Sequence, residues 1–66
     1  MTPKYPEIRV RLVGEDGHAF AVLGRVMREM RRAGLPPGEI AAFRDEATAG
    51  SYDDLLAAVM RWVDVE

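Results

Sequence analysis

One segment of this chain has the pattern of a β-strand, and that segment constrains the fold more than any other. In IRVRLV, residues 8–13, apolar side chains alternate with arginines: Ile8, Arg9, Val10, Arg11 and Leu12. This alternation is typical of a strand that buries one face. A single strand cannot pair its own backbone N–H and C=O groups, which are costly to bury unpaired. We therefore expect it to pair either with the tail at residues 63–65 or with the same strand of a second copy, which would form a symmetric homodimer.

The small size of the chain makes such pairing important. With 66 residues we expect one domain, 1–66, with a small core of its own. Domains of this size are usually reinforced by disulfides, a metal or a partner subunit. The chain has no cysteine, and its one histidine, His18, cannot hold zinc without carboxylates. We therefore expect no metal and no cofactor, and stability from helix packing or from association with another chain.

Three helical segments follow the strand. The expected elements are an extended arm at 1–6, a strand at 7–13 and helices at 18–33, 37–49 and 51–63. Gly34 suits the closing position of the first helix, Pro37 the first turn of the second and Ser51 the N-cap of the third. The tail Val63-Asp64-Val65 alternates again, which is compatible with a short last strand. The sequence therefore predicts an α+β fold in the order β-α-α-α, with a short C-terminal strand as an addition to it.

The helical spacing also predicts which side chains form the core. On the first helix the apolar side chains share an arc of about 160°. The residues expected to face the interior are Phe20, Val22, Leu23, Val26, Met27 and Met30 of the first helix, Ile40, Phe43 and Ala47 of the second, and Tyr52, Leu55, Leu56, Val59, Met60, Trp62 and Val63 of the third.

The residues of this chain do not form a catalytic set. Nucleophilic catalysis needs a nucleophile with a base and an orienting group, but Ser51 is better explained as a helix cap, and His18 is the only histidine. Two pairs of carboxylates stand at helix starts, where they stabilise the helix dipole without further function: Glu15 with Asp16, and Asp53 with Asp54. The loop GEDG at 14–17 is acidic and lacks the Lys-Ser/Thr pair of a P-loop. We therefore predict no catalytic residue and no enzymatic activity.

Four arginines give the most prominent functional signal: Arg25, Arg28, Arg31 and Arg32. They lie opposite the apolar arc of the first helix, and three of them, at spacing i, i+3, i+7, span about 10 Å of its axis. Such a face suits a phosphate, a nucleotide or an acidic protein surface. It also suits an ordinary solvated helix face, because Glu29 is placed to pair with Arg25 or with Arg28. The four arginines are therefore a candidate anion- or partner-binding site, and both interpretations stay open.

Arg9 and Arg11 support a second hypothesis, which is DNA binding. A strand followed by two helices that dimerises through the strand is the plan of ribbon-helix-helix repressors, in which outward strand side chains contact bases in the major groove. Arg9, Arg11 and Val13 would make those contacts, and arginine commonly contacts guanine. Three features depart from this plan: the acidic turn at 14–17, a third apolar helix, and a net charge of −2 from 9 basic and 11 acidic residues.

The chain resembles a set of short proteins from actinobacteria and their plasmids or phages, to which no activity is assigned. The resemblance lies in two segments, YPEIRVRLVGEDGHAFAVLGRV and AGSYDDLLAAVMRWVDV. Similar proteins commonly have Gly-Asn or Gly-His before the first helix, and here the pair is Gly17-His18. The resemblance implies a bacterial origin and a mobile-element setting. It supplies no catalytic residues.

The sequence therefore favours a small non-enzymatic interaction or regulatory protein that self-associates or binds another protein. The alternatives are a DNA-binding regulator that uses Arg9 and Arg11, and a protein that binds an anionic small molecule at the four arginines. No apolar run approaches the ~18 residues of a membrane span, and the N-terminus lacks the apolar core of a signal peptide. We therefore expect no membrane association and a cytoplasmic location.

Overall fold

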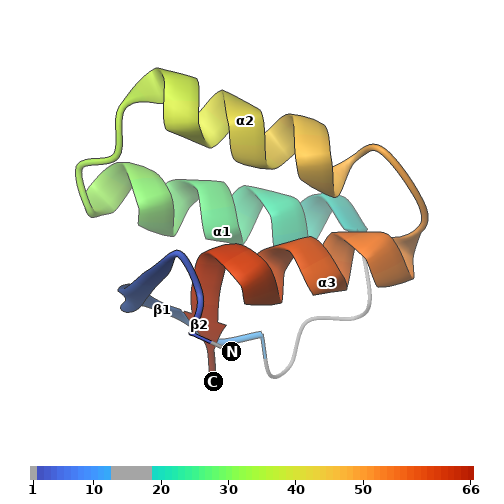
Figure 1. Cartoon of the computed structure of the whole chain (residues 1–66), viewed down its shortest axis with the longest axis horizontal. Helices are drawn as coiled ribbons and strands as arrows, with labels where there is room; N and C mark the ends of the chain where they lie inside the picture. The colour runs from blue at the N-terminus through green and yellow to red at the C-terminus, as the bar shows by residue number, and fades with distance from the viewer. Residues whose placement is uncertain (1, 13–18) are drawn as a thin grey trace.

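The computed structural model describes residues 2–12 and 19–66, in which three helices lie between two short strands (Figure 1). In chain order the elements are β1 (Tyr5–Val10), α1 (Ala19–Arg32), α2 (Pro37–Ala47), α3 (Tyr52–Trp62) and β2 (Val63–Val65). Figure 1 shows each helix running antiparallel to the next, with both strands near the end of α3. The predicted α+β class, with the order β-α-α-α and a short C-terminal strand, is confirmed.

β1 pairs with β2 in parallel, so the tail of the chain is a partner of the predicted strand. The paired residues are Tyr5 with Val63, Arg9 with Asp64, and Val10 with Val65. Parallel neighbours need a long crossover, and here the three helices supply it. The register is irregular between Tyr5 and Arg9. Pro6 lies in this stretch, and we attribute the irregularity to it because proline has no N–H to donate to a ladder.

β1 starts two residues earlier and ends three residues earlier than the sequence predicts, so the expected N-terminal arm ends inside it. Backbone hydrogen bonds to the last turn of α3 and from the residue after β2 mark the two limits. At the start, the N–H of Lys4 donates to the carbonyl of Arg61 at 2.8 Å, and at the end the N–H of Glu66 donates to the carbonyl of Val10 at 2.9 Å. The alternating pattern continues beyond Val10, but β2 is too short to pair with it.

Each helix lies within its predicted range. The residues expected at the helix ends also occupy those positions. Gly34 has a φ of 89°, which favours glycine because it has no Cβ. The N–H of Gly34 donates to the carbonyl of Arg31 at 3.0 Å, and that of Leu35 donates to Met30 at 3.1 Å. These two bonds form the Schellman motif that ends α1. Pro37 occupies the first turn of α2, as predicted.

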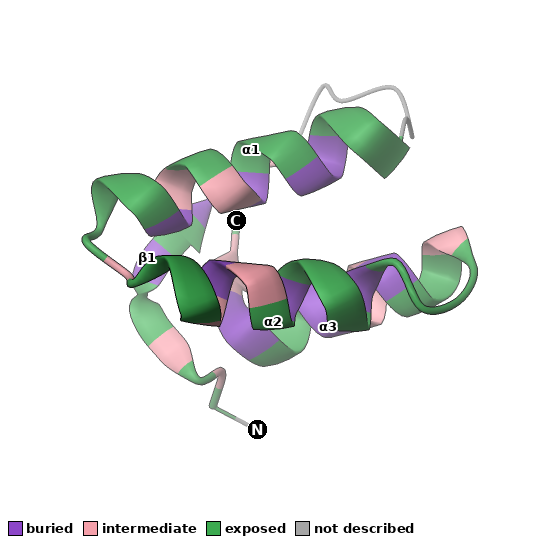
Figure 2. Cartoon of the chain, turned by 90° about the horizontal axis from the view of Figure 1, so that it is seen from above, coloured by how far each residue is buried: buried purple, intermediate pink, exposed green. Residues whose placement is uncertain are grey.

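The core lies between the helices and one face of the small sheet (Figure 2). The buried residues are Ile8 and Val10 of β1, Val22, Leu23, Val26 and Met30 of α1, Ile40, Phe43 and Ala47 of α2, Leu55, Ala58, Val59 and Trp62 of α3, and Val63 of β2. Figure 2 shows the buried side of α1 turned towards the other two helices. No buried side-chain nitrogen or oxygen in the described residues lacks a hydrogen-bond partner.

The predicted core contains two errors, Phe20 and Met60, which are 78% and 59% exposed. Both errors arise because the apolar arcs assumed for α1 and α3 are wider than the faces that the helices bury. Phe20 lies about 100° from the centre of the buried stripe of α1, and Met60 lies about 150° from that of α3, at 100° per residue. In α3 the buried stripe instead includes Ala58, which is fully buried.

Candidate functional site

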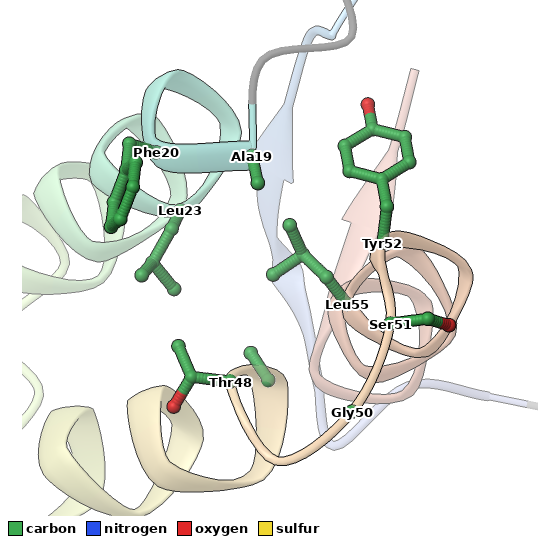
Figure 3. A pocket seen from close by; sticks show the side chains of 9 residues that line it. Ala19, Phe20, Leu23, Thr48, Gly50, Ser51, Tyr52 and Leu55 are labelled. Atoms are coloured by element: carbon green, nitrogen blue, oxygen red, sulfur yellow. The ribbon is translucent and has the colours of Figure 1, made fainter.

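The ends of the three helices enclose an apolar groove (Figure 3). The groove lies between the first turn of α1, the last turn of α2 and the first turn of α3, and its volume is about 190 Å³. The described residues that line it are Ala19, Phe20, Leu23, Ala47, Thr48, Gly50, Ser51, Tyr52 and Leu55. Figure 3 shows Leu23, Thr48 and Leu55 pointing into the space between the helix ends. We refer to this feature as the helix-end groove.

The helix-end groove joins an exposed aromatic ring to the buried core. Leu23, Ala47 and Leu55 are buried and form its floor. Phe20 from α1 and Tyr52 from α3 flank this floor, and Phe20 is the most exposed of the large apolar side chains described. An exposed apolar surface beside a well-packed floor is typical of a site at which proteins interact.

The turn between α2 and α3 fixes one wall of the groove. Ser51 and Asp54 form a capping box. The N–H of Ser51 donates to Oδ2 of Asp54 at 2.9 Å, and the N–H of Asp54 donates to Oγ of Ser51 at 3.3 Å. A Cβ at Gly50 would collide with the Asp54 carboxylate, so glycine leaves the room that this cap needs. The predicted N-cap is thus confirmed, and Asp54 has a structural role.

The chemistry of the helix-end groove is that of apolar recognition. None of the described residues that line it carries a carboxylate, an imidazole or a basic side chain. The hydroxyl of Thr48 donates to the carbonyl of Arg44 at 2.7 Å, and that of Ser51 belongs to the capping box and points away from the groove in Figure 3. These residues do not provide a nucleophile together with a base.

The four arginines of α1 are exposed, and they line three shallow hollows along the helix. Arg25 and Arg28 line a shallow hollow with Phe20. Arg31 lines a groove between α1 and α2, together with Arg44. Arg32 lies beside β1 and pairs with Glu29, with 3.6 Å between Nη1 and Oε2.

Because α1 is one continuous helix, Arg25, Arg28 and Arg32 lie within about 60° of one another on its exposed face. The structure brings Arg25 and Arg28 together, and it adds Arg44 of α2 beside Arg31. Glu29 pairs with Arg32, a partner that was not predicted from the spacing.

Arg9, one of the two strand arginines, is held among carboxylates of the C-terminal tail. Its Nε lies 3.6 Å from Oδ2 of Asp64, and its Nη1 lies 4.0 Å from Oε1 of Glu66. Arg11 is exposed and lies just after β1. The tail therefore places negative charge beside the strand face that the DNA-binding hypothesis would use.

A polar cluster at the start of β1 was not predicted from the sequence. The hydroxyl of Tyr5 donates to Oε1 of Glu39 at 2.7 Å, and Nζ of Lys4 lies 3.0 Å from the same oxygen. The ammonium of Lys4 also lies 4.5 Å from the ring centroid of Trp62, and the rings of Tyr5 and Trp62 are stacked at 6.1 Å. The cluster joins the N-terminal segment to α2 and to the end of α3.

The contacts of this cluster shift three pKa values. The hydrogen bond from Tyr5, followed by that from Lys4, lowers the pKa of Glu39. The same hydrogen bond raises the pKa of Tyr5, and the bond to Glu39 raises the pKa of Lys4. All three groups are solvent-accessible, so we interpret the cluster as a tether between elements.

Several sequence predictions lie outside the described residues. These are the ones that concern Val13, the loop at 14–17 with Glu15 and Asp16, and His18. In the part of the chain that is described, no group of three or more His, Cys, Asp or Glu side chains is arranged to hold a metal ion. Over the same residues, no helix has the length and apolar character to cross a membrane.

Comparison with known proteins adds no relative. No family model, curated protein or solved structure matches this chain. The resemblance to short actinobacterial proteins therefore stays a prediction, and it is the surfaces of the molecule itself that indicate a function.

Proposed function

We propose that this chain is a non-enzymatic interaction protein that self-associates and binds an apolar segment of a partner protein in the helix-end groove. The observation that carries the binding proposal is the position of Phe20. Its ring is 78% exposed and stands beside a floor made by buried Leu23 and Leu55. An interface that covered this ring would remove one of the largest apolar side chains of the surface from water.

The size of the groove favours a protein partner over a small metabolite. Sites for small molecules usually have about 300–1,000 Å³ and a few convergent polar groups. The helix-end groove has about 190 Å³, and none of its described lining residues is charged. It is therefore suited to one large apolar side chain, of the kind that anchors many protein interfaces. Its neutral lining favours an apolar anchor over an acidic or a basic one.

The two alternative functions have less support from the geometry. A protein that contacts DNA through β1 would present Arg9 to a base, but Asp64 and Glu66 lie beside this arginine. An anionic small molecule would have Arg25 and Arg28 beside one shallow hollow, but Arg32 on the same helix face is paired with Glu29. Both alternatives predict binding that falls steeply with salt, whereas binding at the helix-end groove should depend on it weakly.

The binding proposal can be tested with a library of random peptides displayed on phage. The immobilised wild-type chain should select peptides that share an aromatic or aliphatic anchor. A selected peptide should bind the Phe20→Ser variant about tenfold or more weakly, because truncation of a central anchor contact has an effect of this size. The matched control is Met60→Ser, which removes another exposed apolar side chain on the opposite side of α3 from the core.

The two variants show whether the selected peptide binds at the helix-end groove. Loss of binding with Phe20→Ser and normal binding with Met60→Ser would support the groove. Equal loss with both, or selection of no peptide by the wild-type chain, would overturn it. Circular dichroism of each variant separates loss of binding from loss of fold.

A further inference from the structure

A second groove lies between α1 and α2, and its volume is about 220 Å³. Its floor is apolar. The apolar residues that line it are Met27, Leu35, Pro37, Ile40 and Ala41. Among the described lining residues, the charged side chains are Arg31 from α1 and Arg44 from α2, and no carboxylate is among them. We refer to this feature as the interhelix groove. Its lining combines an apolar floor with charge of one sign.

Helical spacing explains why these side chains meet. The side that α2 contributes runs from Pro37 to Arg44 at spacing i, i+3, i+4, i+7, which is one face of a helix. α1 contributes Met27 and Arg31, at spacing i, i+4. At 100° per residue, Arg31 is turned about 100° from Arg32 and towards α2. Arg31 therefore belongs to the interhelix groove and not to the outer arginine face of α1.

The two arginines lie at opposite ends of the apolar floor. Figure 1 shows α1 and α2 running antiparallel, so Arg31 in the last turn of α1 lies near Pro37 in the first turn of α2. Arg44 follows Pro37 by seven residues, which is about 10 Å further along the axis of α2. The groove thus presents a positive charge, an apolar surface and a second positive charge in succession.

Carboxylates of the chain compete only weakly for these two arginines. Among the described residues, Arg31 takes part in no ion pair, whereas its neighbour Arg32 pairs with Glu29. Nη2 of Arg44 lies 3.4 Å from Oδ1 of Asp45, and both side chains are exposed. Exposed ion pairs of this kind contribute little. A carboxylate from outside the chain can therefore replace Asp45 beside Arg44.

We propose that the interhelix groove binds a segment of a partner protein in which one apolar side chain stands between two acidic ones. The apolar side chain would cover the floor, and the two carboxylates would pair with Arg31 and Arg44, since arginine forms charge-assisted hydrogen bonds with carboxylates. In a helical segment, acids four residues before and after the apolar residue share its face and are about 12 Å apart. This separation is close to that of the two arginines along the groove. The surface is distinct from the helix-end groove, whose lining is neutral.

The combination of charge and apolar surface favours a protein segment over a small molecule. Inorganic phosphate would pair with an arginine but would leave the apolar floor in contact with water. A fatty acid would cover the floor, but its single carboxylate can reach only one end of the groove. A volume of about 220 Å³ is also below the range of about 300–1,000 Å³ that is usual for small-molecule sites. An amphipathic segment satisfies both ends and the floor at once.

NMR titration of the ¹⁵N-labelled wild-type chain tests the proposal. The probe is an alanine-rich peptide of about 20 residues, long enough to be helical in water, with a central leucine and glutamates four residues before and after it. It should shift the amide signals of residues 27–31 and 37–44. A peptide with glutamines in place of both glutamates should bind about fivefold or more weakly, as expected for the loss of two exposed ion pairs. A peptide with serine in place of the leucine should also bind more weakly, because the floor stays uncovered.

Variants of the chain assign the binding to this groove. Arg31→Gln/Arg44→Gln should weaken binding of the glutamate peptide about fivefold or more and leave binding of the glutamine peptide unchanged. The matched control is Arg25→Gln/Arg28→Gln, which removes the same charge beside another hollow of α1 and should bind normally. If the first variant does not fold, the comparison of the two peptides on the wild-type chain decides by itself.

The outcomes separate this inference from the proposed function. Equal binding of the glutamate and glutamine peptides, or equal loss with both pairs of arginine variants, would overturn it. No shift at millimolar peptide would overturn it as well. Shifts at residues 27–31 and 37–44 that decanoate or inorganic phosphate produces and the peptide does not would replace it with a site for a small anion. None of these results affects binding at the helix-end groove, which its own variants test.

Discussion

Replacing Phe43 with leucine should destabilise this protein more than the same replacement at Phe20. Phe43 is fully buried, and its ring meets that of Trp62 edge-on, with 5.8 Å between centroids and an angle of 71°. Loss of such an aromatic pair costs about 0.5–1.5 kcal/mol, and imperfect repacking of the leucine adds up to about 1.5 kcal/mol. The free energy of unfolding should therefore fall by about 1–3 kcal/mol. A chain of this size has only about 3–10 kcal/mol in total.

The chain contains its own probe for this experiment. Trp62 is the only tryptophan in the sequence and is buried, so its emission should shift to longer wavelength on unfolding. With a slope of about 1 kcal/mol per molar urea, Phe43→Leu should lower the midpoint by about 1 M or more. Phe20→Leu, at an exposed position, should change stability by less than about 0.5 kcal/mol. Equal shifts for the two variants, or a larger one for Phe20→Leu, would refute the assignment of Phe43 to the core.

Two further predictions concern local contacts. Tyr5→Phe removes the main cause of the low pKa of Glu39, so carboxyl carbon NMR should show that pKa rising towards its ordinary value; an unchanged pKa would contradict the hydrogen bond. Because the pKa of Glu39 is lowered on folding, its stabilising effect is present above the unfolded pKa and is lost as pH falls through the folded one. Ser51→Ala should cost about 1 kcal/mol in urea denaturation through loss of the capping box, whereas an effect near zero would show that the cap contributes little.

The order of elements was predictable because its signals are local. Alternation marked β1, and Gly34, Pro37 and Ser51 marked helix limits that the structure confirms. The limits of β1 were less predictable, since they depend on where β2 begins and ends. The alternating pattern alone could not show that the strand would use Tyr5 and stop at Val10.

The candidate site was much less predictable than the fold. The helix-end groove exists because three helix ends meet, and spacing along one helix contains no information about that meeting. The exposure of Phe20 could have been anticipated from the helical spacing. Phe20 lies at the margin of the apolar arc of the first helix, away from the centre of the buried stripe of α1. The cluster of Lys4, Tyr5 and Glu39 joins residues far apart in the sequence, and no periodic pattern marks it.

Each edge of a lone strand needs its own hydrogen-bond partners, either a neighbouring strand or water. The tail satisfies one edge of β1, so the chain does not depend on a second copy to bury that side of its backbone. The groups on the other edge can bond to water in the monomer, and pairing there replaces those bonds at a modest net gain. Association with a second copy is therefore not needed to complete the fold of one chain. It follows that the chain should stay folded on dilution, and a chain that unfolds on dilution would show that the other edge of β1 needs a partner strand.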